Sequence, residues 1–170
     1  MSINVLVFYG LPCTGKSTII ERILNKGIYE IIRIEEVWLR VSKHPVYSIS
    51  ESGHVFSTLI ELLDDALERG KSVVIEGVFA SKERIFLIRE RVEIFKGKVL
   101  FILLEASDNV IERRLNDRKQ LMRESISFEK YLWLKERFNS GSLCDFRFRT
   151  DLLSIDDILQ TLNSVIFEGK

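Results

Sequence analysis

The chain has 170 residues, of which 46% are hydrophobic and 29% charged, a composition that excludes disorder and fits one globular domain over residues 1–170. Its formal net charge of zero leaves no global positive field that would draw it to nucleic acid or to an anionic membrane. It has only two cysteines, Cys13 and Cys144, and no apolar run as long as a membrane span, so we expect a cytoplasmic protein without membrane contact.

A glycine-rich loop between a strand and a helix opens the chain. Ile3–Tyr9 predicts a buried strand, and Ser17–Lys26 predicts a helix. Between them, Gly10–Thr18 reads GLPCTGKST and fits the P-loop pattern G-x-x-x-x-G-K-[ST], in which backbone N–H groups and a lysine surround phosphate groups. The strand before the loop and the helix after it are the context that this pattern requires.

The P-loop predicts a site for the phosphate groups of a nucleotide. Lys16 is expected to reach the β- and γ-phosphates, and the Ser17 hydroxyl is expected to bind Mg²⁺. The helix that starts near Lys16 adds the positive end of its dipole to this anion site. We interpret Cys13 as a small loop residue and not as a nucleophile, because no histidine lies near it in sequence. The expected nucleotide-binding residues of the loop are Gly10, Pro12, Cys13, Thr14, Gly15, Lys16, Ser17 and Thr18.

Two acidic residues follow the second predicted strand, Glu30–Ile34, and open a polar region over residues 35–50 that predicts a helical turn and a loop. A carboxylate of Glu35 or Glu36, at the same sheet edge as the P-loop, can accept the proton of an incoming hydroxyl group. An exposed helix start also favours acids there through the helix dipole. The sequence leaves open whether either residue is a base, and which one.

The third predicted strand also ends in an acidic residue. A capping-box pattern at residues 48–51 predicts a helix that continues to about Arg69, after which residues 72–75 form a β-branched run typical of a strand. Glu76 and Gly77 follow this run directly. An acid at that point is placed to bind the Mg²⁺ of a nucleotide. A solvated glutamate beside a turn glycine is the alternative.

The second half of the chain continues the alternation of helix and strand. The apolar run at residues 98–104 predicts a central strand, because both of its faces are hydrophobic. Alternating strands and helices predict a parallel sheet that is covered on both faces and binds its ligand beyond the carboxyl ends of the strands. The remaining predicted elements are helices at 81–95, from Ser107 to about 118, at 128–138 and from Ser154 to about 167, and a weaker strand at 144–149.

A basic cluster lies near the end of the helix that starts at Ser107. Arg114 and Arg118 are four residues apart and therefore share one face of this helix. Guanidinium groups at that place can stabilise the charge of a transferring phosphoryl group, or stack on an adenine ring. A solvated helix face that neighbouring acids neutralise is the alternative. The cluster also contains Arg113, Lys119 and Arg123.

Together these motifs resemble the small P-loop kinases, the group that includes polynucleotide kinase, zeta toxin, chloramphenicol phosphotransferase, gluconate kinase and adenylylsulfate kinase. The resemblance implies an α/β, three-layer P-loop NTPase fold with a five-stranded parallel sheet of order 2-3-1-4-5. It also implies ATP and Mg²⁺ as cofactors, a lid at about residues 116–127, and an adenine pocket near Arg118 and the turn at 150–154. Many members have aspartate where this chain has glutamate after its second and third strands. Arg84 is similar to an arginine of several members, which suggests a contact with the acceptor or a phosphate, or else a surface salt bridge.

The expected function is an ATP-dependent kinase that transfers the γ-phosphoryl group to a hydroxyl or phosphate of a small molecule or nucleotide. Lys16, Arg114, Arg118 and one of Glu35 and Glu36 are its expected catalytic residues, and Ser17 and Glu76 its expected metal ligands. A polynucleotide 5′-hydroxyl kinase is one alternative, which the zero net charge does not favour. A nucleotide-binding ATPase is the other, which the single acid after the third strand does not favour. The acceptor and the oligomeric state stay open.

Overall fold

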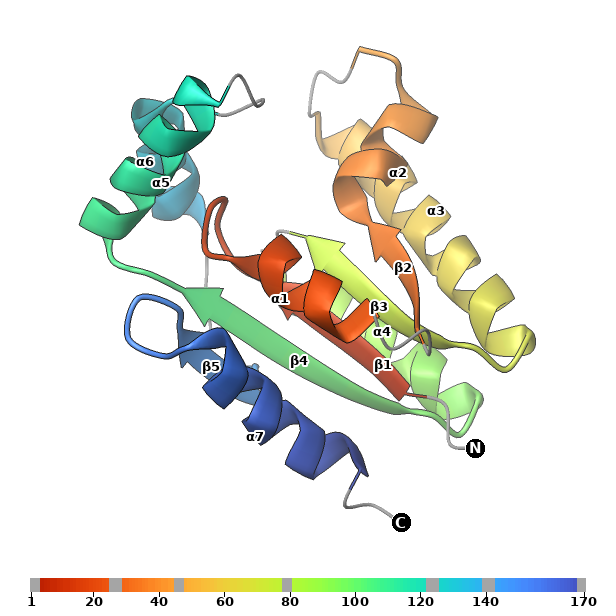
Figure 1. The fold of residues 1–170 in the computed structure, drawn as a ribbon. Helices are drawn as coiled ribbons and strands as arrows, with labels where there is room; N and C mark the ends of the chain where they lie inside the picture. Colours follow the sequence, from red (N-terminus) through yellow and green to blue (C-terminus); the bar gives the residue numbers. More distant parts are fainter. Residues whose placement is uncertain are drawn as a thin grey trace.

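The fold is a five-stranded parallel sheet with helices on both faces (Figure 1). The computed structural model describes residues 4–24, 29–44, 48–77, 81–121, 126–138 and 143–167. The strand order β2-β3-β1-β4-β5 confirms the predicted topology, and every neighbouring pair is parallel. The strands are β1 (Asn4–Tyr9), β2 (Tyr29–Arg33), β3 (Ser72–Gly77), β4 (Lys98–Glu105) and β5 (Phe146–Arg149).

The helices form the two outer layers. In Figure 1, α1 and α7 lie on one face of the sheet and α3 and α4 on the other, whereas α5 and α6 lie beyond the carboxyl ends of the strands. No helix in the described ranges is long and apolar enough to cross a membrane. The helices are α1 (Lys16–Leu24), α2 (Ile34–Val41), α3 (Ile49–Glu68), α4 (Lys82–Ile94), α5 (Asp108–Gln120), α6 (Phe128–Arg137) and α7 (Ile155–Phe167).

The alternation of side chains along β1 explains why the sheet has two hydrophobic layers. Val5 and Val7 face the layer that α3 and α4 complete, and Leu6 and Phe8 face the layer that α1 and α7 complete. All four side chains are buried, because successive residues of a strand point to opposite faces and both faces are covered. This central position of β1 places the P-loop in the middle of the carboxyl edge of the sheet.

The predicted capping box at residues 48–51 is present, and a second one begins α7. The Ser48 hydroxyl accepts a hydrogen bond from the Glu51 N–H, and the Glu51 carboxylate accepts one from the Ser48 N–H. Ser154 and Asp157 make the same reciprocal pair at the start of α7. These side chains satisfy N–H groups that a helix start leaves unpaired, which fixes where α3 and α7 begin.

Helix α2 is longer than the sequence predicted. Helix α2 runs for eight residues where the sequence predicted only a helical turn and a loop. Its acids in the first turn and Arg40 in the last complement the helix dipole, and Val37 is buried beneath it. Ser107 stands at the N-cap position of α5, but its side chain makes no capping hydrogen bond. The Ser107 N–H donates instead to Asp151, across the sheet edge.

Candidate nucleotide site

The backbone of the P-loop follows a path that glycine makes possible. Gly10 has a φ of 146°, and a Cβ built on it would lie 2.3 Å from the carbonyl oxygen of Leu104 on β4. Gly15 has a φ of 94°, also in the region that side chains disfavour. Cys13 adopts a φ of 62° despite its side chain, which is unusual for a non-glycine residue. The loop therefore lies tightly against β4 and holds a strained conformation.

The Lys16 ammonium group lies back across the loop. Its Nζ donates to the carbonyl oxygens of Gly10 and Leu11, each at 2.9 Å. An ammonium has three N–H donors, so these two bonds leave one for an external acceptor. Burial of the group lowers the pKa of Lys16 to about 8, although the carboxylates of Glu76 and Glu35 act in the opposite direction. The lysine is thus desolvated and held in place before any anion binds.

Three other predicted site residues contribute to the electrostatic field at this ammonium group. Glu76 from the end of β3 and Glu35 from the first turn of α2 both favour the charged form of Lys16. Arg118, near the end of α5, acts on Lys16 as a repelling positive charge. Side chains from β3, α2 and α5 therefore act on the charge of Lys16, and their roles in a reaction stay predictions.

Glu35 and Glu36 have different surroundings although they are adjacent. Glu35 is exposed and contributes to the electrostatic field at Lys16. The Glu36 carboxylate forms an ion pair with Arg33, in which the Glu36 Oε1 accepts from the Arg33 Nη1 at 3.2 Å. The structure thus distinguishes Glu35 from Glu36, between which the sequence offered no choice.

A serine hydroxyl and a carboxylate adjoin at the start of α1. The Ser17 Oγ donates to the Glu76 Oε1 at 2.6 Å, so the two expected metal ligands are in direct contact. Both offer hard oxygen atoms, which is the donor set that Mg²⁺ prefers. No cluster of three or more histidine, cysteine or acidic side chains suited to a metal occurs in the described part of the chain. A Mg²⁺ ion on Ser17 and Glu76 would therefore take its other ligands from phosphate and water, as this ion commonly does.

Gly77 allows close packing between the end of β3 and the start of α2. A Cβ at this position would lie 2.9 Å from the Cδ1 and 3.1 Å from the Cβ of Ile34. Ile34 is the first residue of α2, so the glycine lets this helix approach the end of β3. The close approach brings the first turn of α2, with Glu35, toward Glu76.

Arg114 braces the P-loop from the side of α5. Its Nη1 donates to the Cys13 carbonyl oxygen and to the Thr150 Oγ1, both at 3.0 Å, and its Nη2 donates to the Thr150 carbonyl oxygen at 3.1 Å. The Thr150 Oγ1 in turn donates to the Thr14 carbonyl oxygen at 2.8 Å. These bonds hold the strained part of the loop against the turn after β5. A contact between Arg114 and a phosphoryl group stays a prediction.

The other basic residues of the prediction lie apart from this brace. Arg118 is exposed, and its adenine contact stays a prediction. Residues 116–120 of the expected lid belong to α5, and residues 122–125, which include Arg123, lie outside the described residues. Arg84 donates to the backbone and side-chain oxygens of Ser52 and lies 5.0 Å from the ring centroid of Phe56. Arg84 forms no salt bridge within the described ranges, and its predicted contact with an acceptor stays a prediction.

Two residues around the site were not singled out from the sequence. Arg33 and Thr150 both contact predicted site residues, Glu76 and Thr14 respectively. Thr150 lies within a segment that the resemblance connected with adenine, but no pattern predicted its bond to the loop. Arg33 lies directly opposite Glu76 in the β2–β3 register, which a single sequence does not reveal.

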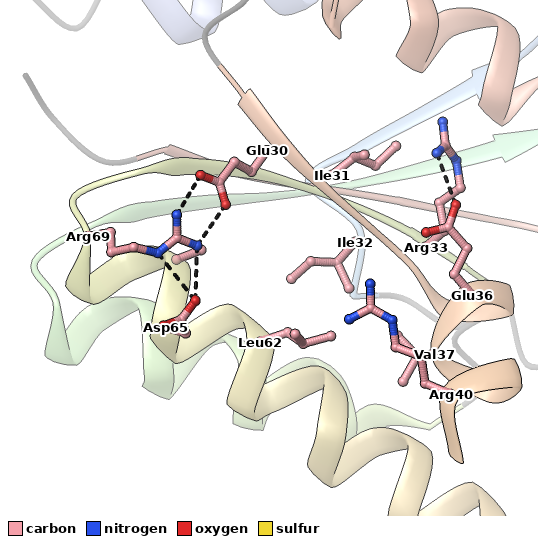
Figure 2. A pocket seen from close by; sticks show the side chains of 11 residues that line it. Glu30, Ile31, Ile32, Arg33, Glu36, Val37, Arg40, Leu62, Asp65 and Arg69 are labelled. Atoms are coloured by element: carbon pink, nitrogen blue, oxygen red, sulfur yellow. Dashed lines mark hydrogen bonds and ion pairs between the residues drawn. The ribbon is translucent and has the colours of Figure 1, made fainter. Parts of the chain in front are cut away.

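A pocket of about 190 Å³ lies along β2, against α2 and α3 (Figure 2). No residue of the P-loop lines it, so the pocket is separate from the predicted phosphate site. Figure 2 shows Arg69 between Glu30 and Asp65 at one end, and the Arg33–Glu36 pair at the other. Its second end is therefore connected to Glu76 through Arg33.

Known proteins resemble this chain at the level of family and fold. A family model described as an AAA domain, AAA_33, matches residues 5–139. A UPF0200 protein of Pyrobaculum aerophilum, whose name states no activity, is 30% identical over 98% of each chain. The APS kinase CysC of Mycobacterium tuberculosis, solved with AMPPNP and APS, has a TM-score of 0.73 at 18% identity, covering 97% of this chain and 98% of that chain.

A gluconokinase of Sinorhizobium meliloti has a TM-score of 0.67 at 16% identity, covering 92% of this chain and 87% of that chain. The TM-scores show that these proteins share the fold of this chain, and the low sequence identities support nothing beyond the fold. The family match covers most of the chain, including the P-loop, both acidic positions and the basic cluster. The chain belongs to the AAA_33 family of AAA domains, and its fold is that of the small P-loop kinases.

Proposed function

We propose that this protein is an ATP-dependent phosphotransferase that moves the γ-phosphoryl group to a hydroxyl or phosphate group of a small molecule or nucleotide. One arrangement carries the proposal: the Lys16 ammonium lies in the combined field of Glu76, Glu35 and Arg118. A site for phosphoryl transfer needs a cation at the phosphates, a metal-binding acid and a polar group for the acceptor. The arrangement supplies one candidate for each.

The donor side consists of the P-loop and the start of α1. The loop N–H groups and Lys16 would bind the phosphates, and Ser17 and Glu76 would hold Mg²⁺, which neutralises phosphate charge when it is bound. Arg114 and Thr150 hold the loop in shape through its carbonyl oxygens. Groups that are already oriented need little reorganisation during the reaction, which is the main source of electrostatic catalysis.

The acceptor side begins at α2. We assign Glu35 as the residue that orients the acceptor and takes its proton, because Glu36 is already paired with Arg33. The Glu35 carboxylate is exposed to solvent, and its negative charge favours the charged form of Lys16. An acceptor group between the two side chains would therefore be close to the transferred phosphoryl group. Arg118 would add positive charge from the opposite side of the loop.

The test is a phosphotransfer screen with labelled ATP and Mg²⁺ over nucleosides, nucleotides, sugars, antibiotics and oligonucleotides. We expect a labelled small-molecule product, and a loss of turnover of about 10³-fold or more in Lys16→Ala, because the phosphates lose their lysine cation. The circular dichroism spectrum should stay that of the wild type. Undiminished ATP-dependent activity in Lys16→Ala would refute the proposal.

The same screen distinguishes the two alternatives. Label that appears only on oligonucleotides, with binding that weakens steeply as salt is raised, would indicate a polynucleotide kinase. Slow release of phosphate with no labelled acceptor would indicate an ATPase without kinase activity. Either result would replace the proposed acceptor class and leave the donor site in place.

A further inference from the structure

Arg33 joins the two acidic positions of the site. It is the last residue of β2 and lies opposite Glu76 in the parallel register of β2 and β3. Its Nε donates to the Glu76 Oε2 at 3.3 Å, and its Nη1 donates to the Glu36 Oε1 at 3.2 Å. One guanidinium group therefore connects the end of β3 to the first turn of α2.

The two oxygen atoms of Glu76 have different partners from different elements. The Oε1 accepts the Ser17 hydroxyl from α1, and the Oε2 accepts the Arg33 Nε from β2. The terminal torsion of a glutamate is broad, so a single hydrogen bond would leave the carboxylate plane poorly fixed. Two donors on opposite sides fix it, and the Glu76 side chain is only 11% exposed.

We propose that Arg33 is a positioning residue for the metal site: it holds the Oε2 of Glu76 so that the Oε1 faces Ser17 and a Mg²⁺ ion. The inference rests on the proposed function, because it assumes that Ser17 and Glu76 hold the metal of a bound nucleotide. Arg33 itself would not contact the metal or the substrate.

The effect of Arg33 follows from the order that it imposes. Without the guanidinium, the Glu76 carboxylate is free to turn away from Ser17, and binding of Mg²⁺ must pay for restoring its orientation. Loss of a residue that orients a metal ligand typically weakens metal affinity by about 10- to 100-fold. The bond through the Arg33 Nε is charge-assisted but long, so we expect an effect near the lower limit of this range.

The ion pair of Arg33 with Glu36 should contribute less to Mg²⁺ binding than its ion pair with Glu76. The Glu36 side chain is 53% exposed, and ion pairs in that setting contribute little because water and salt screen them. Glu36→Gln keeps the shape of the side chain and removes only its charge. We expect it to change the Mg²⁺-dependent affinity by less than about threefold, which would identify Glu76 as the partner that matters.

The experiment measures the affinity for a fluorescent ATP analogue in Mg²⁺ and, separately, in EDTA. For Arg33→Met we expect an affinity about tenfold weaker in Mg²⁺ and unchanged within about twofold in EDTA. Arg33→Lys keeps the positive charge but not the fork that reaches two carboxylates, so its affinity in Mg²⁺ should lie between those of the wild type and Arg33→Met. The ratio of the affinity in Mg²⁺ to the affinity in EDTA, compared between each variant and the wild type, reports on the metal ligand. It does not depend on turnover.

Arg69→Met is the matched control. Arg69 lines the same pocket as Arg33 and also pairs with two carboxylates, those of Glu30 and Asp65 (Figure 2). Neither of these ion pairs involves Glu76. It should leave both affinities at wild-type values. If Arg69→Met changed the ratio as much as Arg33→Met, the effect would be a general one of surface charge, and the proposal would be wrong.

The outcomes separate this inference from the proposed function. An equal loss of affinity in Mg²⁺ and in EDTA, or an unchanged ratio, would overturn the role of Arg33 while the kinase proposal stands. A wild-type protein whose nucleotide affinity does not respond to Mg²⁺ would contradict the metal site itself, and with it the proposed function. If Arg33→Met does not fold, Arg33→Lys decides the question by the same ratio.

Discussion

Arginine side chains hold both the P-loop and the β2 edge, but their partners differ. At the loop, Arg114 donates to uncharged oxygens, two backbone carbonyls and the Thr150 hydroxyl, and it is half-buried. At the β2 edge, Arg33 and Arg69 donate to carboxylates, most of them substantially exposed. Salt and water screen exposed charge pairs but affect part-buried hydrogen bonds to uncharged oxygens much less. The P-loop is therefore held by hydrogen bonds to uncharged oxygens. The β2 edge is held by ion pairs whose charged groups are able to exchange partners.

This difference matches what each region would do in the proposed reaction. A loop that always binds the same triphosphate gains from a fixed shape, because the oriented donors need no rearrangement. An acceptor side must admit a second substrate, and its charged groups must change partners when the substrate binds. Substitutions that change one region at a time test this difference.

The largest effect is expected from adding one methyl group to the loop. Gly10→Ala would place a Cβ 2.3 Å from the Leu104 carbonyl oxygen, on a backbone with φ of 146°. Because neither backbone segment can move without disturbing β1 or β4, we expect destabilisation of at least about 3 kcal/mol, or failure to fold. Chemical denaturation of the purified variant measures it.

The same substitution in α3 should have the opposite sign. Gly53 is helical, and a Cβ built on it would meet nothing within 4 Å. Gly53→Ala should therefore raise the free energy of unfolding by about 0.5–1 kcal/mol, because alanine loses less backbone entropy in a helix. If Gly10→Ala were as well tolerated as Gly53→Ala, the loop would not be held tightly against β4.

The second prediction concerns the charge of Lys16. Burial lowers its pKa from 10.5 to about 8, so the free protein loses this cation as the pH rises through 8. Nucleotide binding needs the cation, so affinity should fall by up to about tenfold per pH unit above 8, until the pKa in the complex is reached. Fluorescent nucleotide titrations between pH 7 and about 10 measure this slope.

Stability should change in the other direction over the same pH range. Between pH 8 and 10.5 the unfolded chain binds more protons at Lys16 than the folded chain does, so this residue's contribution to the free energy of unfolding rises with pH. Below pH 8 the cost of burying the ammonium is fully present. Lys16→Met should remove both trends, and a wild-type slope in that variant would assign them to another group.

The third prediction removes the brace from the loop. Thr150→Val keeps the volume but loses the hydroxyl that donates to Thr14 and accepts from Arg114. The Thr14 carbonyl and the guanidinium each lose a partner, so we expect destabilisation of about 1–2 kcal/mol together with weaker nucleotide binding. Thr150→Ser retains the hydroxyl and should stay near the wild type. Equal losses in the two variants would point to packing instead of hydrogen bonding.

Local sequence signals were sufficient to place most of the helices and strands. The apolar runs at 98–104 and 72–75, and serines that begin helices at 48 and 154, are local features, and each appears in the structure within a few residues of its predicted place. The sheet order followed from the resemblance to P-loop kinases and not from those local signals, and it is confirmed.

The sequence was insufficient where a contact depends on the register between strands or on a turn far along the chain. Arg33 and Glu76 are 43 residues apart, and only the alignment of β2 with β3 brings them together. Thr150 is 136 residues from Thr14. Glu36 differs from Glu35 through a local ion pair with Arg33, three residues before it, which no pattern in the sequence indicated.

The smallest effect is expected at the exposed end of the β2 edge, and its salt dependence sharpens the comparison most directly. Arg69→Met removes a guanidinium that bonds to Glu30 and Asp65, all three of them exposed by at least 40%. We expect the Tm to fall by about 2 °C or less in about 0.1 M salt and not at all in about 1 M salt, where the screening length is shorter than the spacing of most surface charges. The Tm loss in Thr150→Val should persist at both salt concentrations, because the bonds that it removes are part-buried and none of them joins two opposite charges. A salt-sensitive Thr150→Val and a salt-insensitive Arg69→Met would reverse the distinction drawn between the loop and the edge.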